Sequence, residues 1–395
     1  MQFGLFTEFE WMAGHSEQEA FCTSLAQIDE AERLGFDSVW LGEIHFQKGR
    51  SVLPSPLLVA STVAQRTHRV TVGLAVNVLP LGHPLRLAED VATLDHLTHG
   101  RLEYGIGRSG LPSHYGGFNI SMAEGRQLFN EHLEIMLKAW TTEGFSYHGT
   151  YHNIDNVTIV PRPLQQPHPP IRMAATSPET FPLVAERGFK LFAAMRGNSI
   201  PALAPNIRAY REALQAHGHA RRPDDIAVLA AVYVGETRQE AYETPRASSL
   251  NFYHMLRADL YRLCKGTIPP EYEARLKRYD TITYDEIYEQ QAIYGTPQEV
   301  IAKIRWLQAE TGCNNLLCWL NAGSRLTQEQ VLRSMRLFAT EVCLFSPTTE
   351  KEVMPTAQIN GIRECMPQAD CRPLALADQE APRAERLMAF GAAHS

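Results

Sequence analysis

A glycine-rich run that contains one arginine, residues 105–110 (GIGRSG), has the composition of an anion-binding loop. It ends an apolar stretch that begins at residue 102 and that predicts a buried strand. Arg108 would then lie at the carboxyl end of a strand, where α/β folds bind ligands. The run has the spacing of a dinucleotide fingerprint, but residues 112–117 are typical of a loop, not of the helix that this fingerprint needs. We therefore favour an anion-binding loop around Arg108 over a dinucleotide fold or a loop without a ligand.

Polar side chains also follow two earlier apolar stretches. Glu43 and His45 come after residues 38–42, and Asn77 lies at the end of residues 70–78. Because histidine titrates near neutral pH, His45 has the chemistry of a general base or of a hydrogen-bond donor, with Glu43 orienting its ring. Glu43, His45 and Asn77 are therefore candidate catalytic residues. The alternative for His45 is a structural histidine whose hydrogen bonds are satisfied in the core.

A second group of candidate anion-binding residues lies further along the chain. Arg126 is near the start of a predicted helix, 123–141, and Ser177 and Thr180 are at the start of another, 178–187. The free N–H groups and the dipole of a helix N-terminus favour a phosphate. Taken alone, Ser177 is more typical of an ordinary N-cap before Pro178, and Arg126 is equally typical of a surface arginine.

Apolar stretches and segments of helical periodicity alternate along most of the chain, which is typical of βαβ units. We predict a single α/β domain, a (β/α)₈ TIM barrel with insertions, over residues 1–345. The insertions are a hairpin at 145–160 and a helical excursion at 237–294. The predicted strands are 3–6, 38–42, 70–78, 102–106, 171–174, 190–194, 226–234 and 315–320, and the predicted helices are 17–34, 56–65, 85–97, 123–141, 178–187, 200–217, 297–311 and 328–345.

Composition excludes several classes of function. The 395 residues carry a net charge of −7 without a basic tract, which argues against a nucleic-acid partner. No apolar run is long enough to span a membrane, and the N-terminus has no basic segment of a signal peptide. The 7 cysteines are scattered, as in a reduced cytoplasmic protein, and their spacing predicts no metal site. Residues 346–395 change character, and we expect a tail that is partly disordered or packed on a partner subunit.

One long stretch, LPLGHPLRLAEDVATLDHLTHGRLEYGIGR at residues 79–108, resembles the signature region of the bacterial luciferase family of flavin-dependent monooxygenases. The resemblance extends over residues 1–345 through FGLF (3–6), VWLGEIHF (39–46), TEGF (142–145), YGTPQEVIAKI (294–304) and TGCNNL (311–316). It implies a luciferase-like barrel that binds FMN.

The resemblance also implies roles for individual residues. The positions of Arg108, Arg126, Ser177 and Thr180 hold the FMN phosphate in this family, and a non-proline cis peptide at the position of Ala75–Val76 supports the flavin ring. Asn77 would then be close to the flavin or the substrate. Two positions depart from bacterial luciferase, since Ile44 replaces its central histidine and Gly107 replaces its cysteine. We therefore expect negligible light emission with long-chain aldehydes.

The function implied by the resemblance is that of a two-component monooxygenase. Reduced FMN (FMNH₂) from a separate flavin reductase and O₂ would form a flavin hydroperoxide that oxygenates a small organic substrate, by Baeyer–Villiger attack or by hydroxylation. We expect a cytoplasmic homodimer without a nucleic-acid or membrane partner. Two alternatives stay open: a deazaflavin-dependent oxidoreductase on the same barrel, which transfers hydride without O₂, and a non-catalytic luciferase-like subunit.

Overall fold

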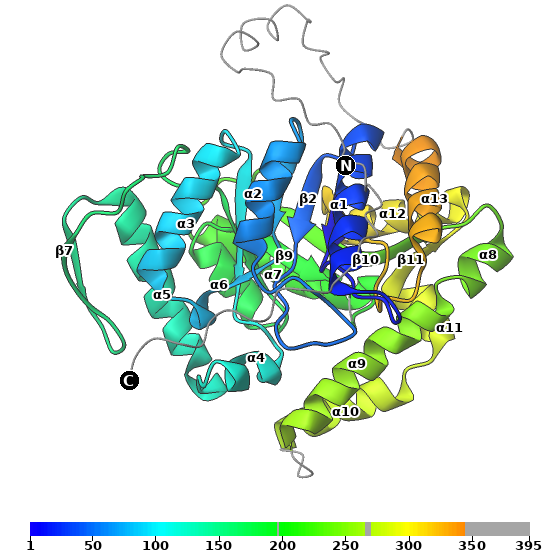
Figure 1. Cartoon of the computed structure of the whole chain (residues 1–395). Coiled ribbons are helices and arrows are strands. Elements are labelled where there is room, and N and C mark those ends of the chain that lie inside the picture. Colours follow the sequence, from blue (N-terminus) through cyan, green and yellow to red (C-terminus); the bar gives the residue numbers. More distant parts are fainter. Residues whose placement is uncertain (196, 265–269, 344–395) are drawn as a thin grey trace, which may run out of the picture. The chain divides into compact units, whose positions relative to one another are not determined.

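The computed structural model describes residues 1–195, 197–264 and 270–343. Its core is a closed barrel of eight parallel strands, because β1 pairs with both β2 and β12, and β9 pairs with β10. The helices surround this barrel (Figure 1). The predicted TIM barrel is therefore confirmed. The barrel strands are β1 (Gln2–Thr7), β2 (Ser38–Leu41), β3 (Thr71–Leu74), β5 (Leu102–Gly107), β8 (Ile171–Ala174), β9 (Lys190–Ala194), β10 (Ile226–Val234) and β12 (Asn315–Trp319).

The outer helices follow the predicted alternation closely because their ends carry local signals. Ser16 and Glu19 form a capping box at the start of the first helix, and Gly35 ends it with a φ of 89°. Thr296 and Thr327 form capping boxes at the starts of two helices in the second half of the chain. The outer helices are α1 (Glu17–Leu34), α2 (Pro56–Arg66), α3 (Pro84–Leu97), α5 (Gly125–Thr141), α6 (Thr180–Glu186), α7 (Ile200–Ala216), α12 (Pro297–Thr311) and α13 (Gln328–Leu337).

The third predicted strand, residues 70–78, is interrupted. It consists of β3 and of β4 (Asn77–Val78), and the peptide bond Ala75–Val76 between them is cis, as the family resemblance implies. β4 continues along β5, which keeps the barrel closed. The neighbouring Gly105 allows this approach, since a Cβ there would lie 1.7 Å from the carbonyl oxygen of Leu74. Apolar periodicity predicts the length of such a strand but not the break within it.

Several local predictions are wrong. Residues 112–117 form a short helix, α4 (Pro112–Gly117), because Pro112 is well placed in a first helical turn. The fifth outer helix, α6, begins at Thr180 instead of residue 178. The last predicted helix, 328–345, ends as a π-helix, η4 (Phe338–Val342). A short strand that the sequence analysis missed, β11 (Ala292–Gly295), pairs with β10.

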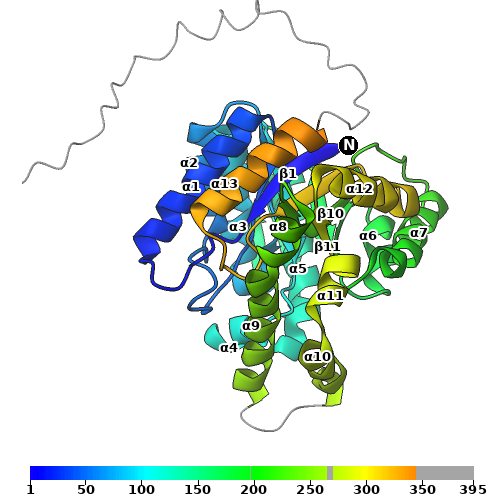
Figure 2. The ribbon, with the colours of Figure 1, turned by 90° about the vertical axis from the view of Figure 1, so that its right-hand side faces the viewer.

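The two predicted insertions are present. The hairpin consists of β6 (Phe145–His148) and β7 (Asn153–Val157), at the edge of the view in Figure 1. The excursion is helical, with α9 (Arg246–Cys264) and α10 (Pro270–Thr281) running side by side away from the barrel (Figure 2). The shorter segments are α8 (Arg238–Glu243), α11 (Tyr284–Glu286), η1 (Leu79–Leu81), η2 (Met122–Glu124) and the π-helix η3 (Ile287–Gln291).

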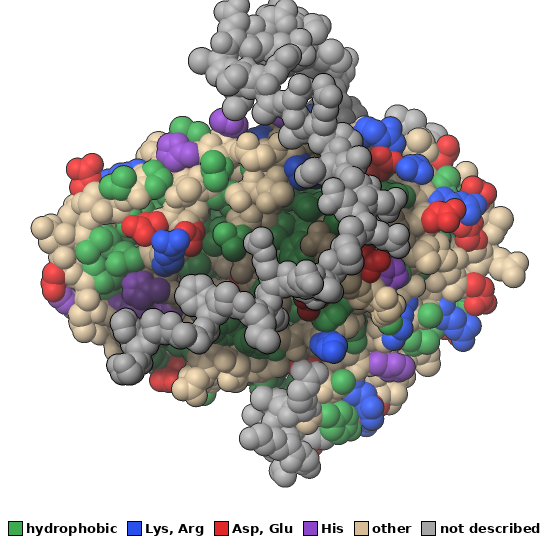
Figure 3. All heavy atoms as spheres, in the orientation of Figure 1, with side chains coloured by type: hydrophobic (Ala, Val, Ile, Leu, Met, Phe, Trp, Pro, Cys, Tyr) green, Lys and Arg blue, Asp and Glu red, His purple; other side chains and the backbone are tan. Residues whose placement is uncertain are grey.

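Two sequence expectations concern the exterior of the protein. The predicted tail, residues 346–395, lies outside the described residues. Among the helices that the structure describes, none is both long and apolar enough to cross a membrane. On the face shown in Figure 3, acidic and basic side chains of the described residues are interspersed.

Candidate active site

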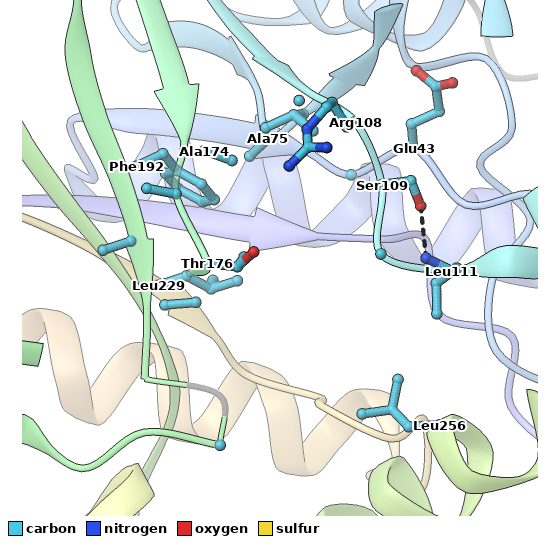
Figure 4. A pocket seen from close by; sticks show the side chains of 18 of the residues that line it. Glu43, Ala75, Arg108, Ser109, Leu111, Ala174, Thr176, Phe192, Leu229 and Leu256 are labelled. Atoms are coloured by element: carbon cyan, nitrogen blue, oxygen red, sulfur yellow. Dashed lines mark hydrogen bonds between the residues drawn. The ribbon is translucent and has the colours of Figure 1, made fainter. Parts of the chain in front are cut away.

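A cavity of about 340 Å³ opens at the carboxyl ends of the barrel strands, the end where TIM barrels bind their ligands. Its lining comes from the barrel strands, from the loops that follow them and from helices α6, α7, α9 and α10, and Figure 4 shows part of it. The apolar lining residues include Phe6, Ile44, Val78, Phe181, Phe192, Leu203, Leu229, Leu256 and Trp319. Such a lining lowers the local dielectric and strengthens each polar contact inside the cavity.

Arg108 extends into this cavity from the end of β5 (Figure 4). Burial lowers the pKa of its guanidinium, and the nearby positive charge of Arg126 lowers it further. The two arginines also line an adjacent hollow of about 140 Å³ together with Thr180. Two neighbouring cations repel each other unless an anion lies between them, so this arrangement favours an anionic ligand.

The predicted phosphate residue Ser177 lies beside the same hollow. Its hydroxyl is 3.0 Å from the hydroxyl of Thr180 and donates a 2.5 Å hydrogen bond to the carboxylate of Glu179. No side-chain hydrogen bond caps α6, so the interpretation of Ser177 as an ordinary N-cap is wrong. The structure thus brings together the four residues predicted from the sequence for the phosphate: Arg108, Arg126, Ser177 and Thr180.

Glu179 is a further member of this cluster that the sequence analysis missed. One carboxylate oxygen is 4.0 Å from a terminal nitrogen of Arg126. The hydrogen bond from Ser177 lowers the pKa of Glu179 most, and the charges of Arg126 and Arg108 contribute. One carboxylate therefore faces two guanidinium groups, which leaves a net positive charge for a ligand. The single glutamate in TSPET carries no motif that could have indicated this contact.

Glu43 and Asn77 form a buried hydrogen-bond network at the ends of β2 and β4. One carboxylate oxygen of Glu43 accepts hydrogen bonds from the side-chain amide of Asn77 at 2.6 Å and from the backbone N–H of Val78 at 2.9 Å. The other oxygen lies 2.9 Å from Nε2 of His45. The amide oxygen of Asn77 accepts a 2.7 Å hydrogen bond from the hydroxyl of Tyr104. This network fixes the geometry around the cis peptide, and it turns the carboxylate of Glu43 away from Arg108 (Figure 4).

His45 does not line the cavity, whereas its neighbour Glu43 does. Its ring packs edge-on against His114 and Phe118 and is also close to Phe46. Ile44, the residue that replaces the luciferase histidine, lines the cavity instead. The side chain of His45 is therefore placed to orient Glu43, whereas the sequence analysis expected Glu43 to orient His45.

His114 and Ser109 form a second polar pair, and both line the cavity. Burial lowers the pKa of His114 to about 3, and electrostatic interactions with His45 and Arg50 add to this effect, so the ring of His114 is neutral at pH 7. Nε2 of His114 accepts a 3.1 Å hydrogen bond from the backbone N–H of His45. Nδ1 must then carry the proton and donate to the hydroxyl oxygen of Ser109, 3.1 Å away. That hydroxyl also accepts from the N–H of Leu111 (Figure 4).

Arg50 and Glu8 contribute a buried ion pair to the cavity wall. Nε and Nη2 of Arg50 donate hydrogen bonds of 2.8 and 2.7 Å to the two carboxylate oxygens of Glu8. Both residues lie in loops without periodicity, 42 positions apart, and no sequence pattern links them. Among the described residues, no cluster of His, Cys, Asp or Glu side chains is arranged to hold a metal ion.

Comparisons with known proteins agree with this geometry. Residues 1–314 match the family model described as "Luciferase-like monooxygenase". The oxygenase component of flavin-dependent trigonelline monooxygenase from Acinetobacter baylyi is 25% identical over 331 residues, which cover 82% of this chain and 90% of that protein. The alkanal monooxygenase alpha chain of the Kryptophanaron alfredi symbiont is 26% identical over 353 residues, covering 87% and 97% of the two chains.

A solved structure shares both the fold and part of the sequence. The monooxygenase RslO1 from Streptomyces bottropensis superposes with a TM-score of 0.73 at 28% sequence identity, covering 87% of this chain and 99% of that one. The match to the family model spans most of the barrel, including the strand ends that carry the Arg108 cluster and the Glu43 network. The chain therefore belongs to the family of luciferase-like, flavin-dependent monooxygenases.

Proposed function

We propose that this protein binds reduced FMN at the mouth of its barrel and uses it with O₂ to oxygenate a small organic substrate. The observation that carries this proposal is the pair of guanidinium groups, Arg108 and Arg126, beside the hydroxyls of Ser177 and Thr180. Arg187 and Glu186 also line this hollow, and Glu179 is close to Arg126, so three guanidinium groups outnumber two carboxylates and suit the dianionic phosphate of a flavin mononucleotide. A flavin without a phosphate would leave the arginines without this partner.

The cavity next to the cluster has room for the flavin ring. Ala75, Val76 and Gly107 line it, and a Cβ at position 107 would lie only 2.5 Å from a methyl group of Val76. The glycine thus keeps free the space that a cysteine side chain would occupy. We propose that the ring packs on the cis peptide Ala75–Val76 and that the apolar lining excludes water from it.

Reduced FMN, when bound, supplies the electrons that activate O₂. Within this proposal, Glu43 is the polar group that lines the cavity, and His45 and Asn77, which do not line it, are positioning residues for its carboxylate. Asn77 and His45 hold the carboxylate of Glu43 in one orientation, and they hold the loop backbone beside the cavity. The Acinetobacter baylyi relative is the oxygenase component of its enzyme, which supports a separate reductase as the supplier of FMNH₂.

An anaerobic titration of the protein with FMNH₂ tests the phosphate site. We expect Arg108→Ala to weaken binding by about 1.5–3 kcal/mol, which corresponds to roughly 10–150-fold, because it removes a charge-assisted hydrogen bond. Reduced riboflavin, which lacks the phosphate, should bind both proteins with similar affinity. Arg33→Ala on the exposed side of α1 serves as the control. An unchanged FMNH₂ affinity of the Arg108 variant would show that the site is assigned incorrectly.

The same titration separates the proposed activity from its alternatives. A deazaflavin-dependent oxidoreductase would bind a reduced deazaflavin in preference to FMNH₂ and would consume no O₂. A non-catalytic subunit would bind neither. For a monooxygenase, we expect O₂ uptake that depends on FMNH₂ and a transient absorbance that differs from both reduced and oxidised FMN. The cytoplasmic homodimer remains a prediction, and light scattering measures its subunit number.

A further inference from the structure

A second cavity lies next to the cavity at the barrel mouth, between helix α9 and the carboxyl ends of β10, β11 and β12. Its volume is about 30 Å³, compared with about 340 Å³ for the cavity at the mouth. Leu229, Tyr253 and Trp319 line both cavities, so they form the boundary between them. The lining residues are buried except for Ala231, which is partly exposed. They are Leu229, Ala231, Ser249, Phe252, Tyr253, Ile287, Gln291, Tyr294, Trp319 and Ala322.

The polar side chains of the second cavity already have hydrogen-bond partners in the protein. The hydroxyl oxygens of Ser249 and Tyr294 are 2.9 Å apart, and the hydroxyl of Tyr253 donates a 2.6 Å hydrogen bond to the side-chain oxygen of Gln291. The indole N–H of Trp319 donates to a buried carboxylate at 2.7 Å. A buried water makes about three hydrogen bonds to groups that have no other partner, and an apolar cavity without such groups stays dry. The second cavity therefore suits an apolar molecule.

The walls of the second cavity are held in place by the loop after β12. The hydroxyl of Ser248 on α9 donates to the carbonyl oxygen of Ala322 at 2.8 Å, and the side-chain amide of Asn251 donates to the carbonyl oxygen of Gly323 at 2.7 Å. A Cβ at Gly323 would lie 1.9 Å from the carbonyl oxygen of Ser248, so only glycine allows this close approach. These contacts fix the start of α9 over the strand ends, and the space between them stays open.

The size of the second cavity limits what it can hold. Roughly 10–15 Å³ of such space holds one water-sized molecule, so a cavity of about 30 Å³ holds a molecule of about two or three heavy atoms. An organic substrate with a carbon skeleton is larger than this. O₂ has two heavy atoms and no charge, and it needs no hydrogen-bond partner.

We propose that the second cavity binds O₂ and supplies it to the cavity at the barrel mouth. This inference rests on the proposed function, in which O₂ is a reactant. Transfer from water to apolar surroundings should enrich a two-atom solute about 10-fold. O₂ that leaves the second cavity past Leu229, Tyr253 or Trp319 enters the flavin cavity directly and does not return to bulk water first.

Paramagnetic relaxation by dissolved O₂ locates this site without flavin. The full chain, labelled at its isoleucine methyl groups, is compared by NMR under O₂ and under N₂. We expect the relaxation enhancement at Ile287, which lines the second cavity, to be about 10-fold that at Ile135 and Ile293, which are 0% exposed and line neither cavity. Equal enhancements at the three residues would overturn the proposal. A water NOE at the Ile287 methyl group would also overturn it, because the cavity would then be hydrated.

Filling the cavity tests its role in the supply of O₂. Ala231→Val and Ala322→Val each add two methyl groups to the lining, and the second variant replaces the first if one of them fails to fold. We expect each to lower both the enhancement at Ile287 and the second-order rate constant for reoxidation of bound FMNH₂ by O₂, by about 3–10-fold, with unchanged FMNH₂ affinity. Ala202→Val on the exposed side of α7 is the control. An unchanged rate constant in a variant that has lost the enhancement would overturn the supply of O₂ from this site.

The two measurements also separate this inference from the proposed function. Relaxation at Ile287 is measured without flavin, whereas O₂ uptake with FMNH₂ is measured without reference to the second cavity. Equal enhancements in a protein that takes up O₂ with FMNH₂ would overturn the O₂ site alone. A strong enhancement at Ile287 in a protein without such uptake would overturn the proposed function, and the supply of O₂ with it, but not the binding of O₂ in the second cavity.

Discussion

Two buried arginines at opposite ends of the barrel show how differently the two ends are constructed. Arg172 lies near the start of β8 and donates from Nε to Glu103 at 2.7 Å, while its terminal nitrogens bond to the carbonyl oxygens of Leu191, Asp224 and Asp225. Arg50 at the mouth uses two of its three nitrogens for Glu8. Each arginine therefore has a buried carboxylate partner, but only the arginine at the mouth keeps a donor for a ligand.

The charged side chains at one end of the barrel stabilise the fold, whereas those at the other end are available to bind a ligand. At the amino-terminal end, Glu103 also lies 3.6 Å from the ammonium group of Lys190, so the charges belong to a network of protein groups. At the carboxyl-terminal end, the positive charge of Arg108 and Arg126 exceeds the negative charge of Glu179. TIM barrels bind ligands at the carboxyl ends of their strands. Charged side chains there that lack a full set of protein partners can bind a ligand instead.

Substitution of Arg172 should have the largest effect on stability. We expect Arg172→Met to lower the free energy of unfolding by about 3–5 kcal/mol, because Glu103 would be left without its closest cationic partner in the barrel interior. Urea unfolding measures this value. The folded fraction should bind FMNH₂ with wild-type affinity. A loss of flavin affinity without a loss of stability would contradict the division of roles between the two ends.

The pH dependence of stability should reveal His114 at the mouth. Burial lowers the pKa of this histidine from 6.5 to about 3 in the folded state. Below pH 6.5 the unfolded chain binds a proton that the folded protein does not bind, so the free energy of unfolding falls as the pH falls toward 3. The slope is at most about 1.4 kcal/mol per pH unit.

Urea unfolding at pH 7.5 and at pH 5 measures this contribution. We expect the variant His114→Gln to lose less stability between the two pH values than the wild type, whatever constant offset the substitution itself produces. Parallel losses in both proteins would contradict the neutral, buried state of His114.

The smallest expected effect concerns Glu179, whose carboxylate is exposed and competes with a phosphate for the arginines. Glu179→Gln should tighten FMNH₂ binding about twofold to fivefold, as the modest strength of exposed ion pairs predicts. Reduced riboflavin should bind the variant and the wild type equally, because it brings no phosphate to this cluster. A variant that gains affinity for both flavins would show that Glu179 acts on the ring and not on the phosphate.

The barrel and Arg108 at its mouth could be predicted because their signals are local. Apolar stretches of four to nine residues alternate with capped helices, as at Ser16 and Gly35, and each element can be identified from its own residues. The glycine-rich end of β5 marks Arg108 in the same way. Arg126, Ser177 and Thr180 required the family resemblance, because a serine or an arginine at a helix start is common without any ligand.

Other features depend on residues that are distant in the sequence. The helix of residues 112–117 was missed because its proline and glycines are equally common in loops, and its position depends on packing against α9. The orientation of Glu43 depends on Asn77, 34 positions later, and on His45 beside it. His45 lies outside the cavity wall because its ring fills the space between His114 and Phe118, which no periodicity indicates.

The sequence by itself predicted the fold, the end of the barrel at which we propose a ligand and the arginines that we propose to hold an anion there. Only the tertiary structure decided which polar groups are already satisfied and which are free. No sequence pattern distinguishes Arg50 from Arg172. The side-chain nitrogens of Arg172 all bond to protein acceptors, whereas Arg50 uses only two of its three for Glu8. The physical reason is that hydrogen-bond satisfaction depends on the distance between atoms, which the closed barrel sets only when its strands have paired.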